Sequence, residues 1–76
     1  MDKDAYKKFR EILLQLRKAA GLTQSELSQL LNRPQSFVSK YERGERRLDV
    51  IELGDVARAL NVDPAKLLAN FYREVG

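Results

Sequence analysis

The sequence predicts an all-α fold in which five short helices form one compact domain over residues 1–76. Two observations lead to this prediction. Every long segment carries apolar residues at the three- and four-residue steps of a helix, and no segment alternates apolar with polar residues for long enough to form a strand. Capping residues, glycine and proline recur at intervals that divide the chain into five such segments. Because 76 residues make one small domain and no linker-like tract interrupts them, we expect no second domain.

The first two helices are bounded by local signals. The first is expected over about residues 4–20, with Gly21 ending it in the left-handed conformation. Its apolar face consists of Tyr6, Phe9, Ile12, Leu13, Leu16 and Ala20. The second helix is expected over about residues 24–31. Its start has the spacing of a capping box, Thr23 with Glu26, and of a hydrophobic staple, Leu22 with Leu27.

The remaining three helices carry their own start and stop signals. Pro34 is expected at the first position of a third helix of about ten residues, 34–43, which Gly44 ends. Asp49 and Glu52 repeat the capping-box spacing at the start of a fourth helix. The fifth is expected to begin with a staple residue, a cap and a first-turn proline: Val62, Asp63 and Pro64.

Positive charge is concentrated in one part of the chain. Fourteen Lys and Arg residues against eleven Asp and Glu residues give a net charge of +3. Residues 33–47 contain five positive and two negative side chains, so this segment alone accounts for the net charge of the whole chain. Such a segment is typical of a protein that binds a polyanion, although a solvated charged loop has the same composition.

The composition also excludes several classes of function. The chain has no cysteine and no histidine, so it lacks thiolate ligands, the commonest metal ligand and the commonest general base. Carboxylates such as Glu52 and Asp55 are expected only as cap and surface residues. We therefore expect no enzyme, no catalytic residue, no metal and no cofactor, and the small core argues against a small-molecule ligand. The longest uncharged apolar run, residues 12–14, is too short to span a membrane, so we expect a cytoplasmic protein without a membrane partner.

Residues 24–43 combine the second helix, a turn and the third helix into the unit that carries the functional prediction. On a helical wheel the third helix gathers three apolar residues on one side: Phe37, Val38 and Tyr41. The opposite side carries amide, hydroxyl and cationic groups but no acid: Gln35, Ser36, Ser39, Lys40 and Arg43. Such groups can bond to base edges in the major groove of DNA, and the alternative is an ordinary solvated face.

A short helix can enter the major groove only if the preceding helix holds it at a steep angle. Ser28 provides the small residue that a close crossing needs, and Asn32 tolerates the left-handed conformation of a tight turn. The two helices would share apolar contacts from Leu27, Leu31, Val38 and Tyr41. The sequence therefore predicts that the third helix is held where it can read duplex DNA.

Three runs of the sequence carry a recognisable pattern. The first consists of LR at residues 16–17 and AGLTQSEL at 20–27, the second is QSFVSKYERGERR at 35–47 and the third is ARALNV at 57–62. Together these runs resemble the Cro and phage-repressor type of helix-turn-helix domain, also called the xenobiotic-response-element family. The resemblance implies a compact five-helix, lambda-repressor-like DNA-binding domain. It also implies a role in bacterial or phage transcriptional control, with double-stranded DNA as the partner.

The resemblance further implies roles for individual residues. Gln24 matches a glutamine that contacts a DNA phosphate at the start of the second helix, and Arg43 matches a phosphate contact at the end of the third. Arg46 and Arg47 lie in a loop that commonly follows the DNA backbone. The positions that match base-reading residues are Gln35, Ser36 and Lys40, with Ser39 beside them.

One expected pair is structural, and three positions depart from the family pattern. In many members an arginine and a glutamate at the positions of Arg17 and Glu42 form an ion pair that ties the first helix to the third. Asn32 stands where the family usually has glycine, Arg33 where it has an aliphatic residue and Pro34 where it has a serine or threonine cap. Arg33 is therefore expected either to contact a phosphate of the DNA backbone or to point into solvent.

A single third helix reads only about four or five base pairs, too few to select one site in a genome. We therefore expect a homodimer on a two-fold symmetric operator. The predicted dimer surface, with a place in the core as the alternative, consists of Leu67, Leu68, Phe71 and Tyr72. The alternative function is a protein-interaction module such as an antitoxin or an anti-activator, but the basic loop and the acid-free face argue against it.

Overall fold

The computed structural model describes residues 3–76 and contains five helices and no strand in this range. The helices are α1 (Lys3–Ala19), α2 (Gln24–Leu30), α3 (Ser36–Glu42), α4 (Val50–Ala59) and α5 (Pro64–Val75). The predicted all-α class and the five-helix division are therefore confirmed. None of the described helices is long and apolar enough to cross a membrane.

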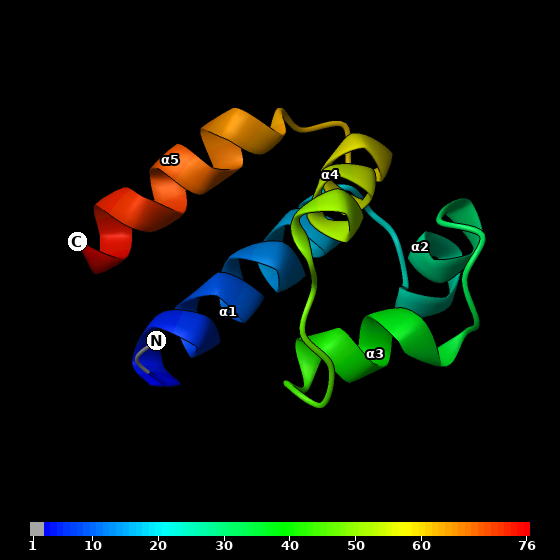
Figure 1. Ribbon diagram of the computed structural model, residues 1–76. Helices are drawn as coiled ribbons and strands as arrows, with labels where there is room; N and C mark the ends of the chain where they lie inside the picture. The colour runs from blue at the N-terminus through cyan, green and yellow to red at the C-terminus, as the bar shows by residue number, and fades with distance from the viewer. Residues whose placement is uncertain (1–2) are drawn as a thin grey trace.

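Helices α1 and α5 run side by side in opposite directions, so that both ends of the described chain lie on one side of the molecule (Figure 1). Helices α2 and α3 form a pair on the other side, and α4 lies between the two groups. Helix α1 packs against α3 as well as α5, and α4 packs against α5. The core between the helices includes Leu13, Leu27, Val38, Val56 and Ala57, all fully buried.

The helix ends follow the sequence signals, because each signal depends on residues that are close in the chain. At the start of α2, Glu26 N donates to Thr23 Oγ1 (3.0 Å) and Thr23 N donates to the Glu26 carboxylate (2.8 Å). Asp49 and Glu52 form the same capping box at the start of α4. Glu52 N donates to Asp49 Oδ1 (2.8 Å) and Asp49 N donates to Glu52 Oε1 (3.0 Å). Gly21 ends α1 with a φ of 73°, a conformation that costs glycine little.

The third helix differs from its prediction. It has seven residues and begins at Ser36, whereas the sequence predicts about ten residues that begin at Pro34. In the structure Phe37 N donates to Pro34 O (2.9 Å), which forms a tight turn with an i+3 hydrogen bond. The regular i+4 pattern of an α-helix starts only after this turn. Helical backbone angles extend one residue beyond each end of α3, to Gln35 and Arg43, so the predicted centre of the helix is correct.

Two asparagines adopt the left-handed conformation at tight turns. Asn32 has a φ of 57° between α2 and α3, as its place in the sequence predicts. Asn61 has a φ of 61° between α4 and α5. Asparagine tolerates this conformation better than most residues because its short side chain can bond locally. The turn at Asn32 reverses the chain within a few residues and brings α3 across α2 (Figure 1).

Two of the four residues of the predicted dimer surface belong instead to the core of the protomer. Leu67 and Phe71 are only 5% and 4% exposed. Helix α5 turns this face toward α1, where Phe71 packs edge to face on Phe9 with ring centroids 5.3 Å apart. The prediction that they form a dimer surface is therefore corrected. Leu68 is half-buried and Tyr72 is 63% exposed, so these two remain candidates for contact with a partner.

Candidate nucleic-acid interface

Apolar side chains anchor the inner face of α3. Phe37, Val38 and Tyr41 are buried, in agreement with their spacing in the sequence. The Phe37 and Tyr41 rings pack edge to face with centroids 5.6 Å apart. Burial raises the pKa of the Tyr41 phenol, so this side chain stays neutral at physiological pH. This inner face fixes which side of α3 is turned outward.

An ion pair ties α1 to the C-terminal end of α3. Arg17 Nε donates to Glu42 Oε2 (2.8 Å) and Arg17 Nη2 donates to Glu42 Oε1 (3.1 Å), which is the two-pronged geometry of a strong pair. Arg17 Nη1 also donates to Leu22 O (2.8 Å). The two charged side chains are only 11% and 4% exposed. The pair implied by the family resemblance is thus present, and it lies inside the molecule.

The side chain of Gln24 bonds within the protein. Its Nε2 donates to Glu42 Oε1 (2.8 Å), so the amide joins the network that contains Arg17. No sequence signal indicates this contact, because the two residues are 18 positions apart and meet only when α2 packs against α3. The phosphate contact expected of Gln24 stays a prediction.

Ser28 is fully buried where α2 crosses α3. Its Oγ accepts a hydrogen bond from Val38 N (3.3 Å) and donates one to Gln35 O (3.3 Å). Gln35 occupies the N-cap position of α3, but its own side chain makes no capping bond. Ser28 therefore supplies, from the neighbouring helix, a cap that α3 lacks in its own sequence. The small size of Ser28 was predictable, whereas its capping role depends on tertiary packing.

Arg10 on α1 has a corresponding role at the other end of α3. Its Nη1 donates to Glu42 O (3.2 Å), one of the carbonyl groups near the end of the helix. A cation in this place also interacts favourably with the helix dipole. Gly44 has a φ of 81°, and a Cβ atom there would lie 2.9 Å from the Arg10 guanidinium carbon. No signal in the sequence indicates this role of Arg10, and Gly44 indicates only that the helix ends.

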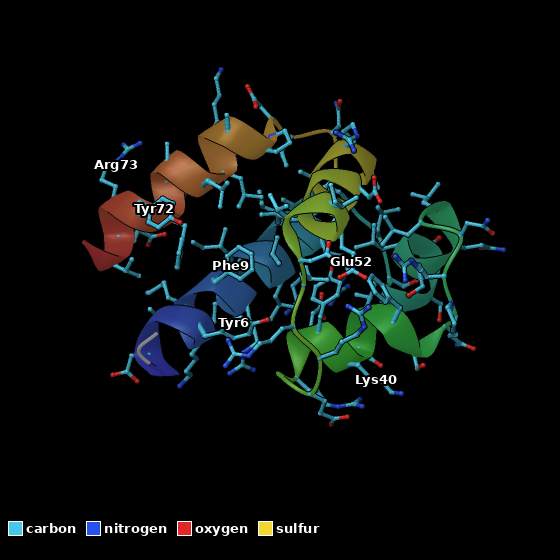
Figure 2. The ribbon with its side chains drawn as sticks, in the orientation of Figure 1. Tyr6, Phe9, Lys40, Glu52, Tyr72 and Arg73 are labelled. Atoms are coloured by element: carbon cyan, nitrogen blue, oxygen red, sulfur yellow. The ribbon has the colours of Figure 1, made fainter. Side chains whose placement is uncertain are left out.

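The outer face of α3 carries the predicted base-reading residues. Gln35, Ser36, Lys40 and Arg43 are exposed, and Ser39 is half-buried. Lys40 points away from the body of the molecule (Figure 2). Gln35 Nε2 donates to Ser25 Oγ (2.8 Å), and Ser39 Oγ donates to Ser36 O (3.1 Å). Both bonds lie at the surface, where they can be exchanged for bonds to DNA at little net cost.

Two of the predicted phosphate contacts have weakly held side chains. Arg43 forms an ion pair with Glu45, in which Nε lies 2.7 Å from Oε2, and this hydrogen bond lowers the pKa of Glu45. More than half of each side chain is exposed, so the pair contributes little and Arg43 can turn to a phosphate. The Arg47 guanidinium lies over the Tyr6 ring on α1, 4.4 Å from its centroid.

The other two arginines among the predicted phosphate contacts, Arg33 and Arg46, share one carboxylate on α4. Two nitrogens of Arg46 donate to Glu52 at 2.9 and 2.6 Å, and one nitrogen of Arg33 donates to Glu52 at 3.3 Å. Glu52 is 8% exposed, which corrects the expectation of a surface residue. The hydrogen bond from Arg46 is the main cause that lowers the pKa of Glu52 to about 2. Arg33 is therefore held by an ion pair with Glu52. The sequence led us to expect either a phosphate contact or a side chain that points into solvent, and neither expectation included this pair.

The chain matches the helix-turn-helix family over residues 13–67, a range that contains all of α2, α3 and α4. It belongs to this family. A protein of known structure, an XRE-family like protein from Pseudomonas syringae pv. tomato str. DC3000, is 48% identical to this chain with a TM-score of 0.90, and the match covers 96% of this chain and 89% of that protein. The restriction-modification controller protein C.AhdI from Aeromonas hydrophila is 35% identical, has a TM-score of 0.74 and covers 82% of this chain and 94% of its own.

A more distant likeness concerns the fold alone. The clp gene regulator ClgR from C. glutamicum is 22% identical, with a TM-score of 0.79, and covers 95% of this chain and 94% of its own. No curated protein matches the chain. Membership of the helix-turn-helix family confirms the predicted XRE-type domain. It also places the chain among DNA-binding transcription regulators, in agreement with the expectation that it is not an enzyme.

Proposed function

We propose that this protein regulates transcription by binding a specific duplex DNA sequence as a homodimer on a two-fold symmetric operator, with α3 in the major groove. The observation that carries the proposal is the exposed, acid-free face of α3. In this reading the protein works in the cytoplasm, where the bacterial or phage DNA lies. The likeness to a restriction-modification controller protein supports a regulatory role.

The side chains of this face match the chemistry of base edges. The amide of Gln35 can bond to an adenine through both of its polar atoms, and Lys40 can donate to the acceptors of a guanine. Ser36 and Ser39 adapt to donors or acceptors, because a hydroxyl is both. Cations at both ends of α3 and in the following loop fix the helix on the backbone: Arg33, Arg43, Arg46 and Arg47, with Gln24 at the start of α2.

Two copies are needed because one α3 is short. Seven residues of helix expose only a few side chains to base edges, enough for about four or five base pairs. A second copy, placed about one helical turn away on the same face of the duplex, doubles the recognised length. The proposed operator is therefore two-fold symmetric, with one half-site for each protomer.

The experiment is selection from a pool of random duplex DNA, followed by affinity measurements on the enriched sequence at several salt concentrations. We expect a two-fold symmetric motif. We also expect a slope of log affinity against log salt near −5 to −7, which corresponds to about six to eight neutralised phosphates. Lys40→Ala should change the base preferred at one position of each half-site. Lys66→Ala, an exposed cation on α5, should leave the motif unchanged.

The opposite result would be a pool without enrichment and an affinity that responds weakly to salt. That combination would overturn the DNA-binding proposal. It would favour the protein-interaction module instead.

A further inference from the structure

Two arginines that flank α3 lie against the same aromatic ring. Arg33 comes from the turn before α3 and Arg46 from the loop after it. Their guanidinium carbons lie 4.8 and 4.9 Å from the centroid of the Phe37 ring, within the range of cation–π contact. Because Phe37 itself belongs to the buried core, the ring gives both cations a fixed platform.

Glu52 binds both of these arginines. The residue lies on the part of α4 that faces α3 (Figure 2). Its Oε1 accepts hydrogen bonds from Arg46 Nη1 (2.9 Å) and Asp49 N (3.0 Å). Its Oε2 accepts bonds from Arg46 Nη2 (2.6 Å) and Arg33 Nη2 (3.3 Å). With four bonds and a side chain that is 10% exposed, this carboxylate has a single position, and it fixes the two guanidinium groups relative to each other.

The arginines keep donors for another ligand. A guanidinium has five N–H groups. Within residues 3–76 Arg46 uses three of them, two on Glu52 and one on Arg47 O (2.8 Å), and Arg33 uses one. Their side chains are 36% and 39% exposed, so solvent reaches both of them. Two cations and one carboxylate leave the cluster with one positive charge.

We propose that Arg33, Glu52 and Arg46 form one preorganised site for a phosphate of the DNA backbone, in which Glu52 is the positioning residue. The proposal rests on the proposed function, because it names the part of the same interface that holds the backbone next to α3. Guanidinium groups bind phosphate through paired N–H donors, and a fixed pair loses less side-chain freedom on binding than two mobile arginines. Glu52 therefore strengthens the binding of an anion although it is itself an anion.

A positioning role for Glu52 and a purely Coulombic role predict opposite changes in DNA affinity when the negative charge of Glu52 is removed. If the negative charge of Glu52 only competed with phosphates, its removal would tighten DNA binding. If Glu52 holds the arginines in place, its removal loosens them and weakens binding, even though the net charge of the protein becomes more positive. The sign of one affinity change thus separates the two accounts.

The test is Glu52→Gln, measured on the operator obtained by selection. Glutamine has the same shape and also serves at this position of a capping box, so the variant should fold. We expect affinity to fall about tenfold, the effect of freeing two long side chains. The matched control is Glu45→Gln, which removes an exposed acid from Arg43 and should raise affinity about twofold. An increase for Glu52→Gln, like that of the control, would overturn the proposal.

A second comparison distinguishes an effect of Glu52 on the positions of Arg33 and Arg46 from an effect of Glu52 elsewhere in the fold. In a protein that already carries Arg33→Ala and Arg46→Ala, the further change Glu52→Gln should no longer weaken binding. A continued tenfold loss in that background would mean that Glu52 acts elsewhere in the fold, which would also overturn the proposal. Helicity by circular dichroism accompanies every variant.

Arg33→Ala alone gives an independent test if Glu52→Gln does not fold, because it leaves the Arg46–Glu52 pair intact. It should weaken binding to all sequences alike and make the salt slope less steep by about one for each protomer. An unchanged slope would remove Arg33 from the site. Failure of the wild-type protein to enrich any DNA would overturn the proposed function itself, which is a different result from either of these.

Discussion

Glu42 accepts side-chain hydrogen bonds from two other helices, two from Arg17 on α1 and one from Gln24 on α2. Its backbone carbonyl accepts a further one from Arg10. One residue at the end of α3 therefore sets the position of that helix relative to both neighbours. The pairing of Arg17 with Glu42 could be expected from the family resemblance, but Gln24 and Arg10 could not, because their contacts depend on the tertiary packing.

Removal of Arg17 should therefore affect folding more than recognition. Arg17→Ala leaves a buried carboxylate without its charged partner, which costs roughly 3–5 kcal/mol of unfolding free energy. Urea denaturation measures this change. Arg58→Ala breaks an exposed ion pair with Asp55 and should change stability by less than about 0.5 kcal/mol. Native stability combined with lost DNA binding would instead make Arg17 a direct contact.

The charge of Glu52 makes a contribution to stability that is lost in acid. Its pKa is lowered from 4.5 to about 2, so the ionised form stabilises the fold above about pH 4.5, and this contribution disappears as the pH falls toward 2. We expect the Tm of the wild-type protein to exceed that of Glu52→Gln by a constant amount above about pH 5. The difference should shrink between pH 4.5 and 2. A difference that does not change with pH would show that the charge of Glu52 does not stabilise the fold.

At the scale of elements, α3 is short and is held from outside at both ends. Ser28 caps its beginning from α2, and Arg10 binds a carbonyl near its end from α1. The boundaries of α2, α4 and α5 could be predicted because their caps lie within a few residues of each start. The start of α3 could not, because an i+3 turn at Pro34 and a cap from another helix replace the local signal.

Ser28→Ala tests the cap that α2 provides to α3. The variant keeps the small size needed at the crossing but leaves the buried Val38 N without its hydroxyl partner, which should cost about 1–2 kcal/mol. Denaturant unfolding gives the value. Ser39→Ala removes a hydroxyl that bonds only near the surface, to Ser36 O within the same helix, and should stay within about 0.5 kcal/mol of wild type. Equal effects of the two changes would contradict a special role for Ser28.

At the scale of the whole molecule, the sequence predicts the number of helices and most of the core but not which apolar residues stay outside. Leu67, Phe71 and Tyr72 all lie on α5, and Tyr72 directly follows Phe71 in the sequence. Leu67 and Phe71 are nevertheless buried, whereas Tyr72 is exposed. The difference depends on how α5 is rotated against α1, which no local signal specifies. Val50 and Ile51, at the start of α4, are 74% and 70% exposed, which no pattern in the sequence indicates.

These exposed residues lead to a prediction about the proposed dimer. Val50 and Ile51 follow directly after the loop that carries Arg46 and Arg47, so a second copy bound there would stay close to the same stretch of DNA. We expect Ile51→Glu to shift the protein toward monomer in sedimentation velocity and to weaken operator binding. Tyr72→Glu, at a similarly exposed position on α5, is the comparison. Dissociation by Tyr72→Glu alone would place the interface on α5, as the sequence predicts.

The two faces of α3 share no side chain. Phe37, Val38, Tyr41 and Glu42 hold the helix in the molecule, while Ser36 and Lys40 are exposed and face outward. Substitutions on the outer face therefore cost the scaffold little. Under the proposed function, such a protein can acquire a new target sequence over evolutionary time by changing a few outward residues, and duplicated copies can diverge in the genes they address while they keep the same architecture.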